Sequence, residues 1–512
     1  MENTQPDDED VQPLTPHQAE LESAMSDNET ILSEEARLDA TRRLAGSQRA
    51  VALLDEFLRE PLLRRESELS LIASYRAALA PQRKLPNELL SNIFAHCVSG
   101  LTEVPATKDK APWSLSYVCS RWRQVVLAQH DLWRRPLFII DGFQWDCRVN
   151  PGRRYASLMA DVLSRTGRSM LSLKFYFKRG RQGDWELRHI SQCLISYADR
   201  LHELSILEKA GESQDFPSDA LNFLEDIPFP NLSSMEVSVP IFDLPAPFDW
   251  LRLQHLELAN IEIGVVPDFH MLRALLSQCT SLLSLTLRVN LPTSPVSGIP
   301  AVMPKLTDLV LYVGNVNGQI ITSIFDILAF PNLKQLVILE DEDAIWEFGL
   351  TSVVIRSGLL SKLYVNFYLP DSEWDDLLAG LPCLSEVILP WGSLMTPSTI
   401  RSISHGDLGP SLTKLLCEAS NSLDLFLDML EVRMSTMSHG TQIKDVGLIF
   451  DHLEEGCSSP DAQLELEQWR NHPRVMELKK QGVNLSLFRS GEVAVDEFVF
   501  PCEYRRTDMY DY

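Results

Sequence analysis

A short leucine pattern recurs along the central part of this chain and restricts the folds that it can adopt. In each occurrence apolar residues hold positions one, four and six, as in Leu201-His-Glu-Leu204-Ser-Ile206. Eight occurrences follow one another at spacings of 21 to 31 residues, starting at Leu201, Leu232, Leu253, Leu282, Leu306, Leu333, Leu360 and Leu384. A period of this size is typical of stacked supersecondary units that close one continuous core together. The sequence therefore predicts a solenoid with one strand per occurrence.

Helix-like runs separate the predicted strands, as at 271–276 and 321–328. Strand and helix alternate, so we expect each occurrence of the pattern to contribute one strand and one helical connection. A weaker occurrence starts at Leu412, and residues 169–175 form a divergent early one. The three apolar side chains of each strand point into the core, where each fully buried aliphatic chain stabilises the fold by about 1.5 to 3 kcal/mol.

The repeated units resemble leucine-rich repeats, and one of them, formed by Leu282, Leu285, Leu287 and Asn290, fits that consensus fully. Most of the other units lack the asparagine and vary in length. The resemblance therefore implies an irregular α/β horseshoe. Together with the N-terminal helices described below, the expected fold class is α+β in several parts.

Positions three, five and seven of each predicted strand point away from the core, because successive side chains alternate across a strand. They are polar in the early strands, as at Glu236 and Glu257, and mostly apolar in the later ones. Exposed apolar surface often marks a binding site. We therefore expect a target-binding surface made of Val310, Tyr312, Val337, Leu339, Lys362, Tyr364 and Ile388. Two alternatives stay open: a C-terminal segment covers these side chains, or the register is shifted by one residue and they are interior.

The N-terminal part before the pattern divides into an acidic tail and a helical segment. Residues 1–35 contain eleven acidic residues and no Lys or Arg, a composition that predicts disorder. From Arg37 onward apolar residues such as Leu44, Val51 and Leu58 recur at helical spacing. Pro61 predicts either two helices or one helix kinked there. With fewer than four clean heptads, packing onto the next domain is favoured over a coiled-coil dimer.

A short apolar helix is predicted at 85–94, which reads Leu-Pro-Asn-Glu-Leu-Leu-Ser-Asn-Ile-Phe. Proline suits the first turn of a helix, and a glutamate is favourable near the positive N-terminus. Leu89 with Ile93 and Leu90 with Phe94 are i, i+4 pairs, so the helix carries two adjacent apolar rows. One small core does not usually cover two such rows, and a partner is expected to cover part of them.

Six sequence elements in this region resemble the F-box in their order. They are Leu85-Pro86, Glu88-Leu89-Leu90, Ile93-Phe94, Val118-Cys119, Trp122-Arg123 and Leu132-Trp133. The layout is similar to that of the large F-box families of mushroom-forming fungi. The resemblance implies a three-helix module that docks on a Skp-type adaptor protein, and through it on a cullin-based ubiquitin ligase. It assigns the core and the adaptor-binding surface to Leu85, Pro86, Leu89, Leu90, Ile93, Phe94, Val118, Cys119 and Trp122, without dividing the two roles.

Two qualifications apply to this resemblance. The stretch 99–111 looks longer than the usual connection between the first two helices of an F-box, so the middle helix is poorly placed. An alternative reading is a buried helical hairpin that joins two domains. The predicted domains are an acidic disordered tail (1–35), an amphipathic helical segment (36–81), an F-box (82–136), an irregular leucine-rich-repeat solenoid (137–450), a C-terminal cap (451–500) and a loose tail (501–512).

Composition limits the partners and the compartment. The formal net charge of −25 argues against a nucleic-acid partner, because phosphate contacts need clustered Lys and Arg. The sequence has no apolar run of about 18 residues and no signal-peptide profile, which predicts no membrane contact. Nine scattered cysteines, never two residues apart, predict free thiols in a reducing compartment, so we expect a cytoplasmic or nuclear protein.

The sequence shows no arrangement that catalysis would require. A glycine-rich phosphate loop, a His-Glu-x-x-His motif, paired cysteines at metal-ligand spacing and a Gly-x-Ser-x-Gly elbow are all missing from it. We therefore expect no cofactor, no metal and no enzymatic activity. The resulting hypothesis is a substrate-recognition adaptor of a cullin-type ubiquitin ligase. The alternative is a protein-binding repeat scaffold whose F-box does not support ubiquitin transfer.

Overall fold

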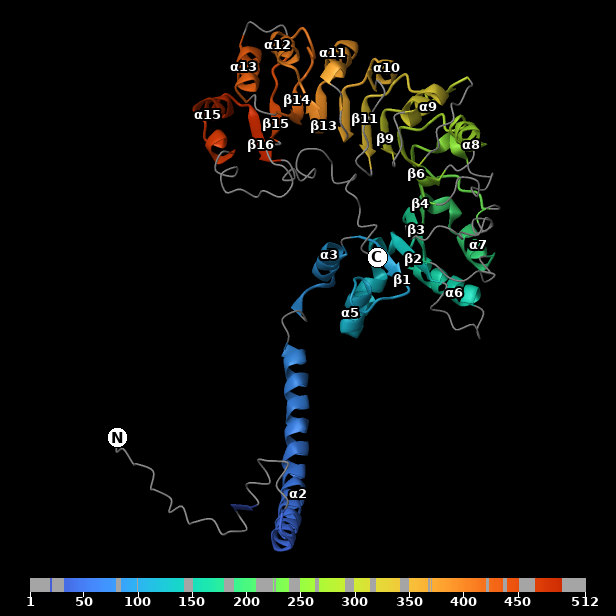
Figure 1. Ribbon diagram of the computed structural model, residues 1–512. Coiled ribbons are helices and arrows are strands. Elements are labelled where there is room, and N and C mark those ends of the chain that lie inside the picture. Colours follow the sequence, from blue (N-terminus) through green and yellow to red (C-terminus); the bar gives the residue numbers. More distant parts are fainter. Residues whose placement is uncertain are drawn as a thin grey trace. The chain divides into compact units, whose positions relative to one another are not determined.

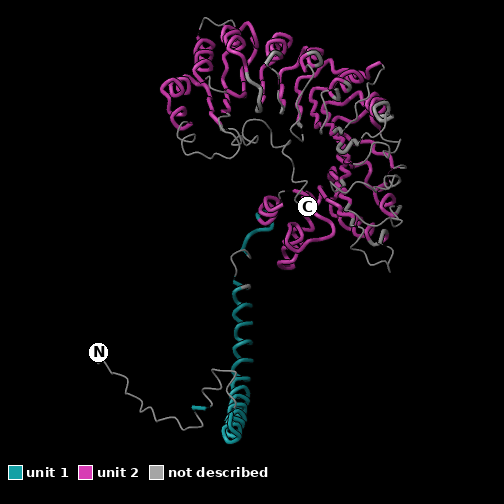
Figure 2. Tube along the Cα trace, viewed as in Figure 1, with its two compact units in different colours: residues 1–89 teal, residues 90–512 magenta. Residues whose placement is uncertain are grey.

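The computed structural model describes most of the chain between residues 32 and 489. The described residues are 19–20, 32–79, 84–98, 100–141, 151–178, 188–208, 224, 227–238, 249–262, 267–290, 299–313, 319–340, 350–366, 369, 371–419, 423–435, 440–450 and 466–489. The predicted loose tail at 501–512 lies outside them, as does nearly all of the predicted acidic tail. The described chain divides into two compact units, residues 1–89 and 90–512 (Figure 2).

The first compact unit consists mainly of one helix, α2 (Glu34–Leu79), which is 46 residues long (Figure 1). Ser33 caps its start: the Ala36 amide donates to the Ser33 hydroxyl oxygen at 3.3 Å. Glu34 and Glu35 place negative charge in the first turn, where it is favourable. The helix passes through Pro61 without ending. The predicted division into two helices at Pro61 is therefore wrong, and one continuous helix is observed.

Three short helices and two strands follow. They are α3 (Asn87–Cys97), β1 (Thr102–Val104), α4 (Trp113–Val118), α5 (Ser120–Ala128) and β2 (Pro136–Asp141). The boundary between the two compact units falls inside α3, after Leu89. The stretch between α3 and α4 that looked too long for an F-box contains β1, which pairs in parallel with β2. These residues therefore begin the large sheet of the second compact unit.

The second compact unit is built on a 14-stranded sheet whose paired neighbours are parallel and follow chain order. After β1 and β2 its strands are β3 (Leu171–Lys178), β4 (Leu201–Glu208), β5 (Ser234–Val237), β6 (His255–Glu262), β7 (Ser284–Asn290), β9 (Asp308–Val313), β11 (Gln335–Glu340), β12 (Lys362–Asn366), β13 (Glu386–Leu394), β14 (Lys414–Glu418), β15 (Asp445–Phe450) and β16 (Asn484–Arg489). The strands β8 (Ala301–Val302) and β10 (Leu328–Ala329) form a separate small parallel pair. The chain is thus a mixed α/β protein with one long parallel sheet.

Helices connect the strands and lie along one face of this sheet (Figure 1). They are α6 (Pro151–Ser164), α7 (Arg188–Ile195), α8 (Pro267–Leu276), α9 (Gln319–Ile327), α10 (Leu350–Val354), α11 (Asp371–Gly380), α12 (Pro397–His405), α13 (Leu423–Met434) and α15 (Pro473–Lys480). A parallel strand pair requires such a crossover, because the chain must return to the same end of the sheet. We call the opposite side of the sheet the second face.

The predicted core positions are confirmed. All 24 residues at positions one, four and six of the eight predicted occurrences are buried, none more than 5% exposed. The weaker occurrence at Leu412 contributes β14, and residues 169–175 overlap β3. The pattern also continues unrecognised into β15 through Ile443, Val446 and Leu448, which are buried as well. The helix-facing core is therefore uniform along the sheet.

Hydroxyl side chains at position two of the pattern tie successive strands together. The Thr307 hydroxyl donates to the Leu283 carbonyl at 3.1 Å, and Ser361 donates to Lys334 at 3.1 Å. Ser385 repeats the contact on Ser361 at 2.9 Å. Each bond joins position two of one occurrence to position two of the preceding one. A short side chain that bonds the neighbouring backbone at a fixed position helps to set the register of the strands.

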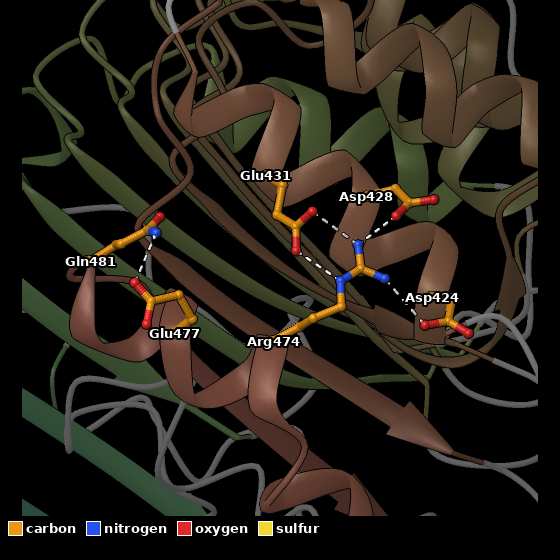
Figure 3. A network of polar contacts seen from close by, with 6 residues as sticks. All are labelled: Asp424, Asp428, Glu431, Arg474, Glu477 and Gln481. Carbon is orange, nitrogen blue, oxygen red and sulfur yellow. Dashed lines mark hydrogen bonds and ion pairs between the residues drawn. The ribbon is translucent and has the colours of Figure 1, made fainter.

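The C-terminal part extends the sheet by one more strand and helix. Arg474 on α15 contacts three carboxylates of α13, those of Asp424, Asp428 and Glu431 (Figure 3). The hydrogen bonds that the Arg474 guanidinium donates to Glu431 and Asp428 raise its pKa. Within the predicted cap, residues 466–489 contain α15 and β16, which add one more helix and strand to the sheet. The ion pairs of Arg474 join α15 to α13.

Candidate functional site

The two apolar rows of α3 lie in different environments. Leu90 and Phe94 are buried, and the Phe94 ring centroid lies 4.8 Å from that of Trp122 on α5. Leu89 and Ile93, each one position earlier on the helix, are 48% and 44% exposed. The structure therefore separates two roles that the sequence left combined. Leu90 and Phe94 pack inside the second compact unit, whereas Leu89 and Ile93 leave nearly half of their surface exposed.

Further exposed apolar side chains lie where α4 meets α5. Val118 ends α4 and is 57% exposed, and its neighbour Tyr117 is 55% exposed. Cys119 has an extended backbone that breaks the helix, and its sulfur accepts a hydrogen bond from the Trp122 amide at 3.5 Å. This capping contact fixes the direction of α5. Leu85 is half-buried and Pro86 is exposed before α3 begins.

The helices α4 and α5 share a core with the first strand of the sheet. The Trp113 indole nitrogen donates to the Glu103 carbonyl at 2.7 Å, and the Thr102 hydroxyl donates to the Leu132 carbonyl at 2.9 Å. The rings of Trp113 and Trp133 meet edge to face with centroids 5.0 Å apart. Buried indole groups that pair both their ring and their N–H give well-defined packing. This core therefore joins the helical module and the sheet firmly.

The second face carries a continuous row of side chains at position five of the pattern. In order of strand pairing, the row consists of Lys174, Ser205, Glu236, Glu257, Thr286, Val310, Val337, Tyr364, Ile388 and Leu416. Its first five members are polar or charged, and its last five are apolar. The change of character predicted from the sequence is therefore located between β7 and β9.

In the polar half, charges lie close together on neighbouring strands. The Lys174 ammonium contacts the Glu236 carboxylate at 2.9 Å and passes over β4, where Ser205 is buried. Burial is the main cause that raises the pKa of Glu257 to about 7, and the Glu236 carboxylate adds to it. Lys174 and Arg288 lower the same pKa. A carboxylate of this kind becomes more readily ionised when a cation approaches.

In the apolar half, the predicted target-binding residues do come together. Val310, Val337, Tyr364 and Ile388 form one cluster with Leu416 and Ile449. All six are buried, so the expectation that these side chains are exposed is wrong for four of the seven predicted residues. Tyr312 and Leu339 are half-buried, and Lys362 is exposed and contacts Glu386 at 2.9 Å. The alternative of a shifted register is wrong, because positions four and six fill the helix-facing core.

Several members of these surfaces were not predicted from the sequence. Leu416 occupies position five of the weaker occurrence at Leu412, and extending the alternation by one occurrence would have included it. Ile449 and Phe488 belong to β15 and β16, whose strands were not assigned to the pattern. Arg288 occupies position seven of β7, and its guanidinium lies 4.8 Å from the Tyr312 ring centroid. A cation over an aromatic face is a favourable contact that spacing alone does not predict.

Comparison with protein-family models and with curated proteins gives no match for this chain. Among the described residues, no group of three or more His, Cys, Asp or Glu side chains is suited to hold a metal ion. No described helix has the length and hydropathy that a membrane span requires. What defines the chain is therefore its own architecture: a helical module joined to a long parallel sheet with two chemically different halves on its second face.

Proposed function

We propose that this protein is a non-catalytic substrate-recognition adaptor of a cullin-type ubiquitin ligase. In this proposal α3, α4 and α5 form an F-box that binds a Skp-type adaptor protein, and the strands form an irregular leucine-rich-repeat solenoid. The second face of the sheet binds a target protein. Ubiquitin transfer is then accelerated by proximity, because a bound target is present at high effective concentration near the transfer site.

One observation carries the proposal: α3 buries one of its apolar rows and exposes the other. Leu89 and Ile93 retain nearly half of their accessible surface, beside a row that is fully buried. Val118 and Tyr117 add exposed apolar surface at the end of α4. Soluble proteins leave large apolar patches exposed mainly where another molecule binds. Leu89, Ile93 and Val118 are among the nine residues to which the F-box resemblance assigns the core and the adaptor-binding surface, and Tyr117 is an addition.

The second face supports target binding in both of its halves. Its polar half places the carboxylates of Glu236 and Glu257 on neighbouring strands, with the Lys174 ammonium beside them. Its apolar half offers Tyr312 and Leu339 at the rim of a buried cluster, with Lys362 exposed beside them. Apolar contact surrounded by charge is the usual composition of a specific protein interface.

The adaptor assignment is tested with the double variant Leu89→Asp and Ile93→Asp in the full chain. Two charges on the exposed row are expected to abolish co-purification of a Skp-type adaptor, because an interface core tolerates unpaired charge poorly. The matched control is Asn92→Asp with Ala95→Asp, which changes exposed positions outside the row of Leu89 and Ile93 on the same helix. It is expected to bind as the wild type does. Unchanged thermal melting of all three proteins excludes loss of folding.

Adaptor binding that survives the Leu89→Asp and Ile93→Asp change would contradict the proposal. The scaffold alternative is separated from it by reconstituted ubiquitination of a co-purified target. Binding without transfer supports the scaffold, and transfer that is lost in the Leu89→Asp and Ile93→Asp variant supports the ligase adaptor.

A further inference from the structure

The helix α2 exposes an unusual amount of apolar surface. Fourteen of its large apolar side chains are 44% to 80% exposed: Leu38, Leu44, Val51, Leu53, Leu54, Phe57, Leu58, Leu62, Leu63, Leu69, Leu71, Ile72, Tyr75 and Leu79. Helices in proteins owe most of their stability to the packing of an apolar face. A soluble protein rarely leaves a patch of this extent uncovered. A partner for α2 is therefore expected.

Eight of these side chains form one seam along the helix. Its members are Leu44, Val51, Leu54, Leu58, Leu62, Leu69, Ile72 and Leu79. Steps of seven residues, with intermediate steps of three and four, are the spacing of a coiled coil. The single step from Leu58 to Leu62 shifts the heptad register next to Pro61, as stutters do in long coiled coils. The seam runs from Leu44 to Leu79, a rise of about 53 Å along the helix.

The length of the seam identifies the kind of partner. A seam of this length is covered by another helix of similar length, packed side by side. The next-longest α-helix among the described residues is α6, with 14 residues, or about 21 Å. The described part of this chain therefore provides no second helix that matches α2. A second copy of α2 matches it in both length and pattern.

The charge of α2 also favours a second copy. The helix has eight acidic and eight basic residues, so its net charge is zero in a chain of net charge −25. Two copies of α2 therefore do not repel one another through net charge, whereas the acidic remainders of two chains do. Most of these charges lie outside the seam, although Ser47, Arg65 and Arg76 interrupt it.

We propose that α2 is a self-association helix, and that two copies of this protein pair through the seam. This inference does not depend on the proposed function. Pairing places two copies of the second face and of the exposed α3 row in one assembly. A partner with two binding sites would then be held far more tightly than by one copy, through effective concentration alone.

The test is the mass of the full-length protein in solution, measured by sedimentation over a range of concentrations. The wild type is expected to have twice the mass of the 58.0 kDa chain. Leu54→Asp with Leu69→Asp puts charge into the seam and is expected to raise the dissociation constant at least about 100-fold. The matched control is Leu53→Asp with Leu71→Asp, one residue from two seam positions and on the outer side of the helix. It is expected to remain dimeric.

Three results would overturn this inference: a wild type that stays monomeric at tens of micromolar, equal effects of the two double variants, or a seam covered in a complex that contains one copy of this chain and another protein. Circular dichroism of both double variants must show equal helix content. If only one variant loses helix, unfolding of α2 and not loss of seam contacts would explain why that variant is monomeric. A charge-neutral replacement, Leu54→Ser with Leu69→Ser, is expected to weaken the dimer in the same direction without adding repulsion.

Discussion

The two faces of the sheet follow different rules, and so do the two halves of the second face. On the helix-facing side every strand places apolar residues at positions four and six, from β4 to β14. On the second face, position five is polar or charged as far as Thr286 on β7 and apolar from Val310 on β9 onward. The uniform side maintains the stacking of strands. The variable side is free to differ, and binding is expected there.

The largest expected effect separates the two faces within single strands. Leu285→Ala in β7 and Leu309→Ala in β9 each remove a fully buried ladder residue and are expected to lower the free energy of unfolding by about 2 to 5 kcal/mol. On the second face, Val310→Ala is expected to cost about 1 to 3 kcal/mol and Thr286→Ala less than about 1 kcal/mol. Urea denaturation followed by circular dichroism measures all four. If Thr286→Ala costs as much as Val310→Ala, the two halves do not differ energetically.

A medium effect is expected at Glu257 in the polar half. Its pKa of about 7 in the folded protein lies above the ordinary value of 4.5, so the native state binds its proton more tightly than the unfolded state does. The resulting stability is present below about pH 4.5 and is lost as the pH rises through 7. Between pH 5 and pH 8 the wild type should therefore lose about 1 to 3 kcal/mol more than Glu257→Gln. Glu203→Gln, on the same face, is the control and should behave as the wild type does.

The smallest effects compare an ion pair from each half. Lys362 and Glu386 in the apolar half form an exposed pair, so Lys362→Met is expected to change stability by less than about 0.5 kcal/mol. Lys174 and Glu236 are less accessible, with side chains 19% and 20% exposed. Removing Lys174 also removes a positive charge that offsets the repulsion between Glu236 and Glu257. Lys174→Met is therefore expected to cost about 1 to 2 kcal/mol in thermal or urea unfolding. If Lys362→Met and Lys174→Met change stability equally, the two halves of the second face do not differ in the strength of their ion pairs.

The sequence was sufficient to predict the helix-facing core because burial imposes one rule at every strand. Positions such as Leu309 and Leu336 must be apolar, and their spacing fixes both strand and face. The polar and apolar halves of the second face followed from the same alternation. The burial of the apolar half could not be predicted in this way. The alternation along a strand shows to which face Val310 points, but it does not show what covers that face.

Other features depend on contacts that spacing does not encode. Which apolar row of α3 is buried is decided by contacts with other elements, such as that of Phe94 with Trp122 on α5. The strand β1 has only three residues, too few for a periodic signal, and is held by pairing with β2. The sequence also left open whether α2 ends at Pro61, and the helix continues through it despite the missing backbone donor.

Pairing of each strand with its neighbours in the chain also has a consequence for how this protein is made. Leu173 on β3 meets Leu204 on β4, and Leu309 on β9 meets Leu336 on β11, so each pairing closes a loop of only a few dozen residues. Short loops close quickly and at little entropic cost. During synthesis each new strand can therefore add to the edge of the preceding one soon after it leaves the ribosome, and no strand has to wait for a distant part of the chain.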